Sequence, residues 1–84
     1  MIVTDTFRLK GYGVVFITVL DCQCPPIGSR LIRPADGQTW TVKGILRYMH
    51  AGPVMIGEQV GVLVSEGPDP QGGDVIERAS QVDE

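Results

Sequence analysis

The apolar positions of this chain fall into short segments separated by glycine- and proline-rich turns, without the 3.6-residue repeat of an amphipathic helix. The segment 2–9 alternates between apolar and polar residues, as a half-buried strand does. This alternation places Val3, Phe7 and Leu9 on the same face of the strand. The segment 14–20 is β-branched or aromatic at almost every position, which predicts a central strand.

Four further strands are predicted after this opening pair, and their bounds are 30–33, 38–49, 59–65 and 74–78. Gly44 interrupts the alternation of the longest strand, which indicates a bulge or a bend at that point. Six short strands at regular spacing favour a barrel, because closure removes the exposed edges of a sheet. We therefore expect a single closed six-stranded antiparallel β-barrel over residues 1–78, followed by a polar, flexible tail at 79–84.

Length and charge narrow the class of protein. The 84 residues suffice for one domain. Residues 1–57 carry six basic and three acidic groups, whereas residues 58–84 carry one basic and seven acidic groups. This asymmetry predicts either a basic surface beside an acidic tail or an ordinary solvated surface. The cations are too scattered for the dense basic stripe of a nucleic-acid-binding protein. Because no secretory signal or membrane-length apolar run is present, we expect a cytoplasmic protein without membrane contact.

Five motifs of this chain follow one another in the order found in a known family. They are Phe7-Arg8-Leu9-Lys10-Gly11-Tyr12-Gly13-Val14-Val15, Pro26-Ile27-Gly28-Ser29-Arg30-Leu31, Val42-Lys43-Gly44-Ile45, Ile56-Gly57-Glu58-Gln59-Val60-Gly61-Val62-Leu63 and Gly73-Asp74-Val75-Ile76. Taken together they resemble domain 2 of elongation factor Tu, the β-barrel that follows the GTP-binding domain in translational GTPases. The resemblance covers residues 7–77 and implies the same barrel fold for this chain.

The resemblance also carries expectations about function. In the family this barrel is mainly a contact surface for other domains and for the ribosome, which implies a protein-binding role. In elongation factor Tu it also helps to hold the aminoacyl end of transfer RNA. Two family positions used for this purpose, an arginine and a glutamate, correspond to Tyr12 and Leu46, which argues against transfer-RNA binding. The Gly-x-x-x-x-Gly-Lys-[Ser/Thr] motif is absent, which excludes nucleotide hydrolysis by this chain.

The candidate binding residues lie on the first strand, on its turn and at the end of the long strand, and they are Arg8, Lys10, Tyr12 and Arg47. Aromatic residues beside arginine are typical of single-stranded nucleic-acid sites and of protein hot spots. We expect Tyr12 to be the most exposed, because it lies at the tip of a turn. Trp40, Tyr48 and Met49 are further candidates for this surface, although a place in the core is the favoured interpretation of Trp40 and Tyr48.

Cys22 and Cys24 are weak candidates for metal ligation, because two thiolates so close in sequence supply half of a zinc or copper site. The single histidine, His50, cannot complete a four-ligand site, although the cysteine pairs of two copies together could. We therefore expect reduced thiols and no bound metal. His50 has no recognisable nucleophile or orienting acid near it in the sequence, so it is expected to be an exposed loop residue.

These observations favour a non-enzymatic interaction module that binds a protein partner through the Tyr12 turn and the neighbouring basic strand. One alternative is an RNA-binding module that uses the same aromatic and basic residues. A second alternative is a homo-oligomeric structural protein. We expect no cofactor and no nucleotide in any of the three cases.

Overall fold

The computed structural model describes residues 1–47, 52–65 and 67–79 of the chain. These residues form six strands and no helix: β1 (Val3–Leu9), β2 (Gly13–Val19), β3 (Arg30–Arg33), β4 (Gln38–Arg47), β5 (Gln59–Val64) and β6 (Glu77–Arg78). The all-β prediction is therefore confirmed, although β6 is shorter than the predicted strand at 74–78. Among the described residues no helix is available that could span a membrane. The end of the predicted long strand and the tail beyond residue 79 fall outside the described residues.

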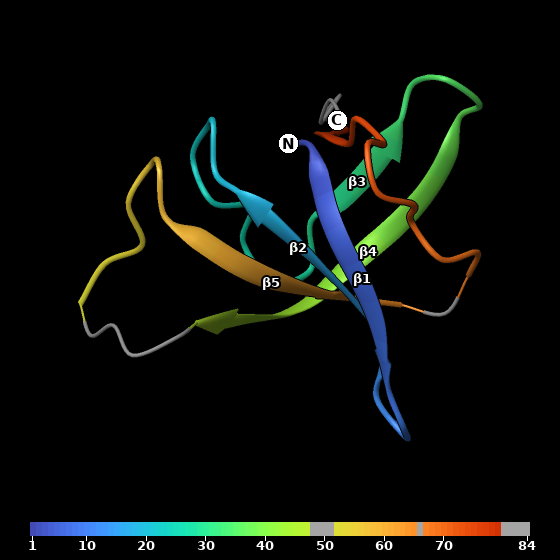
Figure 1. The fold of residues 1–84 in the computed structure, drawn as a ribbon, viewed down its shortest axis with the longest axis horizontal. Helices are drawn as coiled ribbons and strands as arrows, with labels where there is room; N and C mark the ends of the chain where they lie inside the picture. Colours follow the sequence, from blue (N-terminus) through green and yellow to red (C-terminus); the bar gives the residue numbers. More distant parts are fainter. Residues whose placement is uncertain (48–51, 66, 80–84) are drawn as a thin grey trace.

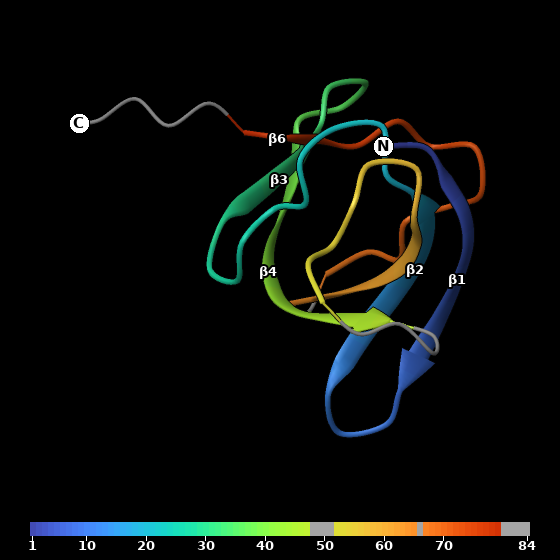
Figure 2. The same cartoon turned by 90° about the vertical axis from the view of Figure 1, so that its left-hand side faces the viewer.

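The strands form one sheet in the order β1-β2-β5-β4-β3-β6, and all neighbouring strands are antiparallel (Figure 1). The first part of β4 pairs with β3, and its second part pairs with β5. The register on β5 shifts between Val42 and Gly44, near this change of partner, so the predicted irregularity at Gly44 is confirmed. Figure 2 shows how β4 curves and lets the sheet curl around the core.

The sheet is not closed into a barrel, and the prediction of a closed barrel is wrong on this point. Its edge strands β1 and β6 do not pair with each other. The segment before β6 runs beside β1 and is joined to this side of the sheet by the isolated bridge between Ile2 and Val75 and by hydrogen bonds of Val3 with Gly73 and Asp74. The Thr6 hydroxyl also donates to the Pro70 carbonyl at 2.6 Å. Pro68 and Pro70 lack backbone N–H groups, so the segment that passes β1 cannot build a continuous ladder. The two edges are therefore joined by separate hydrogen bonds and one ion pair, without a continuous strand ladder.

The core lies on the inner face of the curled sheet. Its fully buried side chains include Phe16, Leu20, Leu31, Trp40, Val62 and Ile76. Trp40 retains 2% exposure, and its indole N–H donates to the carbonyl of Pro68 at 3.0 Å. Trp40 is thus a core residue that also ties the β5–β6 connection to β4. The amino group of Met1 is buried as well and donates to the Ile76 carbonyl at 2.8 Å.

β1 does not keep one side towards the core along its length. Its register on β2 shifts between Val3 and Asp5, so that Val3 pairs with Thr18 whereas Phe7 pairs with Val15. Thr18 and Val15 point to opposite faces of β2 because they are three residues apart. The prediction that Val3 and Phe7 share a face is therefore wrong. The extra residue in the bulge turns the strand over, which leaves Val3 buried and Phe7 43% exposed.

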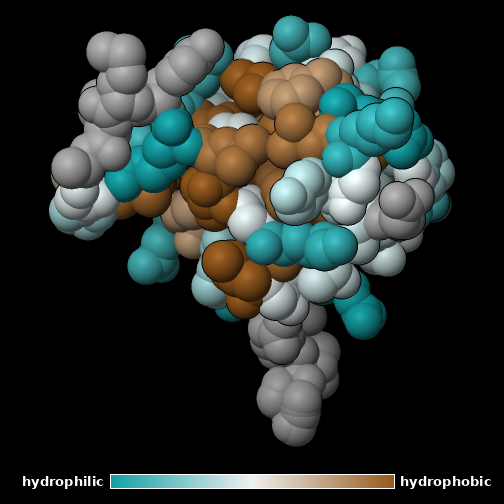
Figure 3. Space-filling model, turned by 90° about the horizontal axis from the view of Figure 1, so that it is seen from below, coloured by the Kyte–Doolittle hydropathy of each residue, from teal (hydrophilic) through white to brown (hydrophobic). Residues whose placement is uncertain are grey.

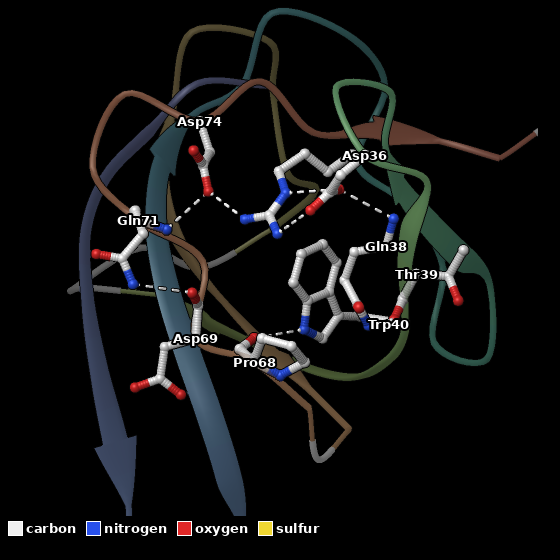
Figure 4. Close-up of polar contacts among 9 residues, drawn as sticks. Asp36, Gln38, Thr39, Trp40, Pro68, Asp69, Gln71 and Asp74 are labelled. Atoms are coloured by element: carbon white, nitrogen blue, oxygen red, sulfur yellow. Dashed lines mark hydrogen bonds and ion pairs between the residues drawn. The ribbon is translucent and has the colours of Figure 1, made fainter.

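A cluster of charges joins the β3–β4 turn to the segment before β6 (Figure 4). The Arg33 guanidinium lies over the Trp40 ring, 5.4 Å from its centroid, and contacts Asp36 and Asp74 at 2.6 Å each. Hydrogen bonds from Arg33 and from the Gln38 N–H lower the pKa of Asp36 to about 2. The pKa of Asp74 is also lowered, first by the hydrogen bond from the Gln71 N–H and then by Arg33. The cluster therefore fixes the part of the chain that brings the two sheet edges together.

Candidate interaction surface

The side of β1, β2, β5 and β4 that faces away from the core is also apolar, and we call it the outer face. Cross-strand pairing defines two rows on it. One row is Phe7, Val15, Leu63 and Gly44, and the next is Asp5, Ile17, Gly61 and Leu46. Strands with apolar residues on both faces are typical of sheets that are covered on both sides. Phe7 and Leu46 nevertheless remain 43% and 40% exposed, so the outer face is open.

A groove of about 260 Å³ runs across the outer face. Its lining residues are Phe7, Ile17, Leu46, Arg47, Gln59, Val60 and Gly61. Figure 3, a view from below, shows apolar side chains gathered on this side of the molecule with hydrophilic ones at their border. The groove is therefore a concave, mainly apolar feature formed by strands that are distant in sequence.

Gly61 forms the floor of the groove. A Cβ atom at this position would lie 3.0 Å from Val15 Cγ1 and 3.4 Å from both Ile17 Cδ1 and Leu46 Cβ. Any larger side chain would therefore project between Ile17 and Leu46 and fill the space. Gly44 lies on the neighbouring strand, where a Cβ atom would meet Leu63 only at ordinary contact distances of 3.6 and 3.8 Å. Of the two glycines, Gly61 lines the groove, and its missing side chain explains the hollow at this point of the outer face.

The β1–β2 turn presents two of the predicted binding residues to solvent. The Tyr12 N–H donates to the Leu9 carbonyl at 2.9 Å and closes the turn, while the side chain of Tyr12 is 67% exposed. Lys10 is exposed on the same turn. Arg8 lies on β1 and forms an ion pair with Asp69 at 2.7 Å. The expected exposure of Tyr12 is confirmed, and Arg8 is already engaged within the chain.

Arg47 lies at the other end of the four-strand layer from this turn. Its Nε and Nη2 atoms donate to the two carboxylate oxygens of Glu58 at 2.6 and 2.9 Å, and Nη1 donates to the Gly52 carbonyl. The hydrogen bond with Glu58 raises the pKa of Arg47. Arg47 thus holds the segment before β5 against β4 and forms one wall of the groove. The structure therefore does not bring Arg47 together with Lys10 and Tyr12.

The cysteine pair lies in the connection between β2 and β3. Cys22 is exposed and Cys24 is half-buried against the core, and both are free thiols. Burial raises the pKa of both thiols, and for Cys22 the neighbouring Asp21 adds to the effect. No cluster of three or more potential metal ligands occurs in the ranges 1–47, 52–65 and 67–79. The remaining predicted residues Tyr48, Met49 and His50 lie outside the described residues.

The sequence pattern does not identify the groove. The alternation of the first strand places Phe7 on the same face as the buried Val3, and no signal in the sequence distinguishes Ile17 and Gly61 from other strand positions. One signal was available, because β2 is apolar at successive positions and such a strand requires cover on both faces. The sequence pattern does not state which face the chain itself leaves uncovered.

Comparisons of the chain with family models, with curated proteins and with solved structures find no match. The resemblance to domain 2 of elongation factor Tu therefore remains a hypothesis based on the five motifs.

Proposed function

We propose that this chain is a non-enzymatic interaction module that holds a protein partner on its outer face. The observation that carries this proposal is the open apolar groove above Gly61. The largest exposed apolar patch of a soluble protein is often an interaction site. Protein hot spots consist of large side chains that enter such desolvated depressions. The partner therefore contributes an apolar side chain that fits between Phe7 and Leu46.

The β1–β2 turn extends this docking surface beyond the groove. Tyr12 and Lys10 are exposed there, and an exposed tyrosine offers a large contact area with few rotatable bonds. The resemblance to domain 2 of elongation factor Tu adds support, because that barrel serves as a contact surface in its own family. The proposal assigns the exposed Lys10 and Tyr12 to the partner and leaves Arg8 and Arg47 in their internal ion pairs.

RNA binding is a second candidate, because an exposed tyrosine beside a lysine also suits the stacking of a single-stranded base. Arg8 and Arg47 are paired with acidic residues, so that Lys10 is left for phosphates among the three predicted binding cations. A salt titration with a ten-nucleotide RNA tests this candidate. An affinity that falls steeply between 50 and 200 mM salt, as about six or more phosphate contacts would require, would favour RNA over a protein partner.

A cross-linking experiment in the source cells tests the proposal. A photoreactive amino acid replaces Leu46 in the groove, and in a matched variant it replaces Ile27, which is 70% exposed on the β2–β3 connection. We expect one discrete adduct from position 46 and none from position 27. The adduct is identified by mass spectrometry, and the partner is then produced as a pure protein. Adducts of equal yield from both positions would contradict a role for the groove.

Affinity measurements with the pure partner complete the test. Gly61→Leu fills the groove, and Leu46→Glu places a charge at its rim without altering its floor. We expect each variant to weaken binding at least about tenfold, since one desolvated anchor is worth about 1.4 kcal/mol or more. Ile27→Glu is the matched control and should bind like the unmodified chain. The fluorescence of Trp40, the only tryptophan, reports whether each variant is folded.

A further inference from the structure

The charge around the outer face is uneven, and this helps to define what the groove accepts. Most arginines of the described ranges are neutralised within the chain: Arg8 by Asp69, Arg33 by Asp36 and Asp74, and Arg47 by Glu58. Lys10 and Lys43 form no ion pair with any of the described acidic residues. Both are exposed, so they remain available to an external anion.

The two lysines flank the same end of the outer face. Lys43 lies in the β4 bulge next to Gly44, whose Cβ position is 3.6 Å from Leu63 Cδ2. Lys10 lies in the turn that leads to Gly13, whose Cβ position is 3.7 Å from Leu63 Cδ1. The side chain of Leu63 therefore bridges the two backbone segments that carry the lysines. Two lysines thus border the outer face at its Leu63 end, and the one acidic residue of its two rows, Asp5, lies at the β1 edge of the other row.

The size of the outer face limits the kind of occupant. Four strands spaced about 4.8 Å apart span roughly 14 Å, and the five residues from Asp5 to Leu9 extend for roughly 17 Å. This area of a few hundred Å² is well below the roughly 800 Å² that each partner of a stable complex buries. A second copy of the chain that docks through this face alone is therefore too weakly held. A short extended segment matches the dimensions of the face.

We infer that the outer face binds an extended protein segment in which a large apolar residue is flanked by aspartate or glutamate. The apolar residue enters the groove above Gly61, and the acidic residues lie beside Lys10 and Lys43. This inference rests on the proposed function and specifies its partner. Opposite charges at the rim of an interface determine which partners associate and how fast, while the apolar anchor supplies most of the affinity.

Selection from a displayed library of random ten-residue peptides tests the inference directly. The purified chain is immobilised, and the enriched peptides are sequenced. We expect a central Leu, Ile, Met or Phe with Asp or Glu within three positions of it. A synthetic peptide with this consensus should lose at least about tenfold in affinity when its apolar residue is replaced by serine.

Two groups of variants separate the groove from the charges. Lys10→Glu combined with Lys43→Glu should weaken the consensus peptide about tenfold at low salt and select basic peptides instead. Arg78→Glu on β6 reverses an exposed charge at the opposite edge of the sheet and should leave the affinity within about twofold. Gly61→Leu and Leu46→Glu should abolish binding of both acidic and basic peptides.

The possible outcomes are distinct. Enriched peptides that contain the apolar residue without acidic neighbours would overturn this inference and leave the groove as a protein-binding site. Peptides that still bind the Gly61→Leu and Leu46→Glu variants would overturn the groove itself and with it the proposed function. Three further outcomes would each overturn the inference. The first is failure to enrich any peptide, and the second is tight binding of a ten-nucleotide RNA that displaces the consensus peptide. The third is a solution mass of twice 9.1 kDa that Leu46→Glu halves.

Discussion

The inner and outer faces of β1, β2, β5 and β4 consist of the same strands and similar residue types, but they differ in their exposure to solvent. On the inner face Phe16 is fully buried, whereas on the outer face Phe7 stays 43% exposed. The inner face is closed by Trp40 and by the connections that cross it, and the outer face has a glycine at its centre. Burial of the inner face explains the fold. The exposed apolar side chains of the outer face, Phe7 and Leu46, are the ones that we assign to binding.

The largest expected difference between the two faces concerns their phenylalanines. Phe16→Ala removes a fully buried ring and should lower the free energy of unfolding by about 3–5 kcal/mol. Phe7→Ala removes a ring that is already half in water and should cost less than about 1 kcal/mol. Urea unfolding followed by Trp40 fluorescence measures both values.

A small domain has only about 5–15 kcal/mol of stability, so Phe16→Ala could leave the chain unfolded in water. Phe16→Leu provides a milder variant that keeps most of the apolar volume and should cost less than about 1.5 kcal/mol. If Phe7→Ala destabilises the chain as much as Phe16→Ala does, the outer face is part of the folding core. The assignment of that face to binding would then be wrong.

The two glycines of the outer face should respond to alanine with opposite signs. Gly61→Ala places a Cβ atom 3.0 Å from Val15, a contact that requires Val15 to shift, and we expect a loss of about 1 kcal/mol. Gly44→Ala meets only ordinary contacts with Leu63, and its backbone is not in the left-handed region. We expect a gain of about 0.4–1 kcal/mol, because alanine restricts the unfolded chain.

The same urea titration measures the free energy of unfolding of both glycine variants. Comparison of the two values separates the effect of the room for a Cβ atom from the effect of backbone conformation. A loss of stability in both would indicate that the bulge in β4 needs glycine for reasons unrelated to the groove. A gain in both would indicate that the floor of the groove yields easily, so that filling it would be a poor test of binding. Opposite signs of the two stability changes would show that the absence of a side chain at Gly61 is the feature that keeps the groove open.

The sequence allowed much of the fold to be predicted and little of the candidate site. Alternation and turn residues correctly located the strands, and the break in period at Gly44 correctly marked the bulge. The bulge between Val3 and Asp5 left no such sign, and it reverses the exposure of Phe7. The groove depends on which residues oppose each other across β1, β2, β5 and β4. That register is a property of the assembled sheet, and a single strand pattern does not contain it.

The cluster around Arg33 provides a test of what keeps the sheet edges together in acid. The pKa of Asp36 is about 2 and the pKa of Asp74 is also lowered, compared with an ordinary value of 3.8. An ionised carboxyl group whose pKa is lowered in the folded chain stabilises the fold at pH values above its ordinary pKa. This stabilisation decreases as the pH falls from about 4 towards 2. We therefore expect the urea midpoint to fall over this window.

The variant with both Asp36→Asn and Asp74→Asn should be less stable at pH 7 and should show a smaller further loss between pH 4 and pH 2. Asp21, whose pKa is lowered by Cys22 and the amino terminus, is unchanged in this variant and supplies the remaining dependence. An acid response identical to that of the unmodified chain would show that inner-face burial alone holds the edges. The ion cluster would then be a consequence of the fold and not one of its supports.

The smallest expected effect concerns the ion pair between Arg8 and Asp69, which connects β1 to the segment between β5 and β6. Its side chains are 55% and 38% exposed, so water and salt screen the attraction. Arg8→Gln should change the free energy of unfolding by less than about 0.5 kcal/mol, as measured by the same urea titration. The matched variant Asp69→Asn and the double variant complete a cycle that isolates the pair. A coupling above about 1 kcal/mol would mean that this edge is held by charge. Charge pairing at the β1 edge would then contribute to the stability of the sheet beside the burial of its inner face.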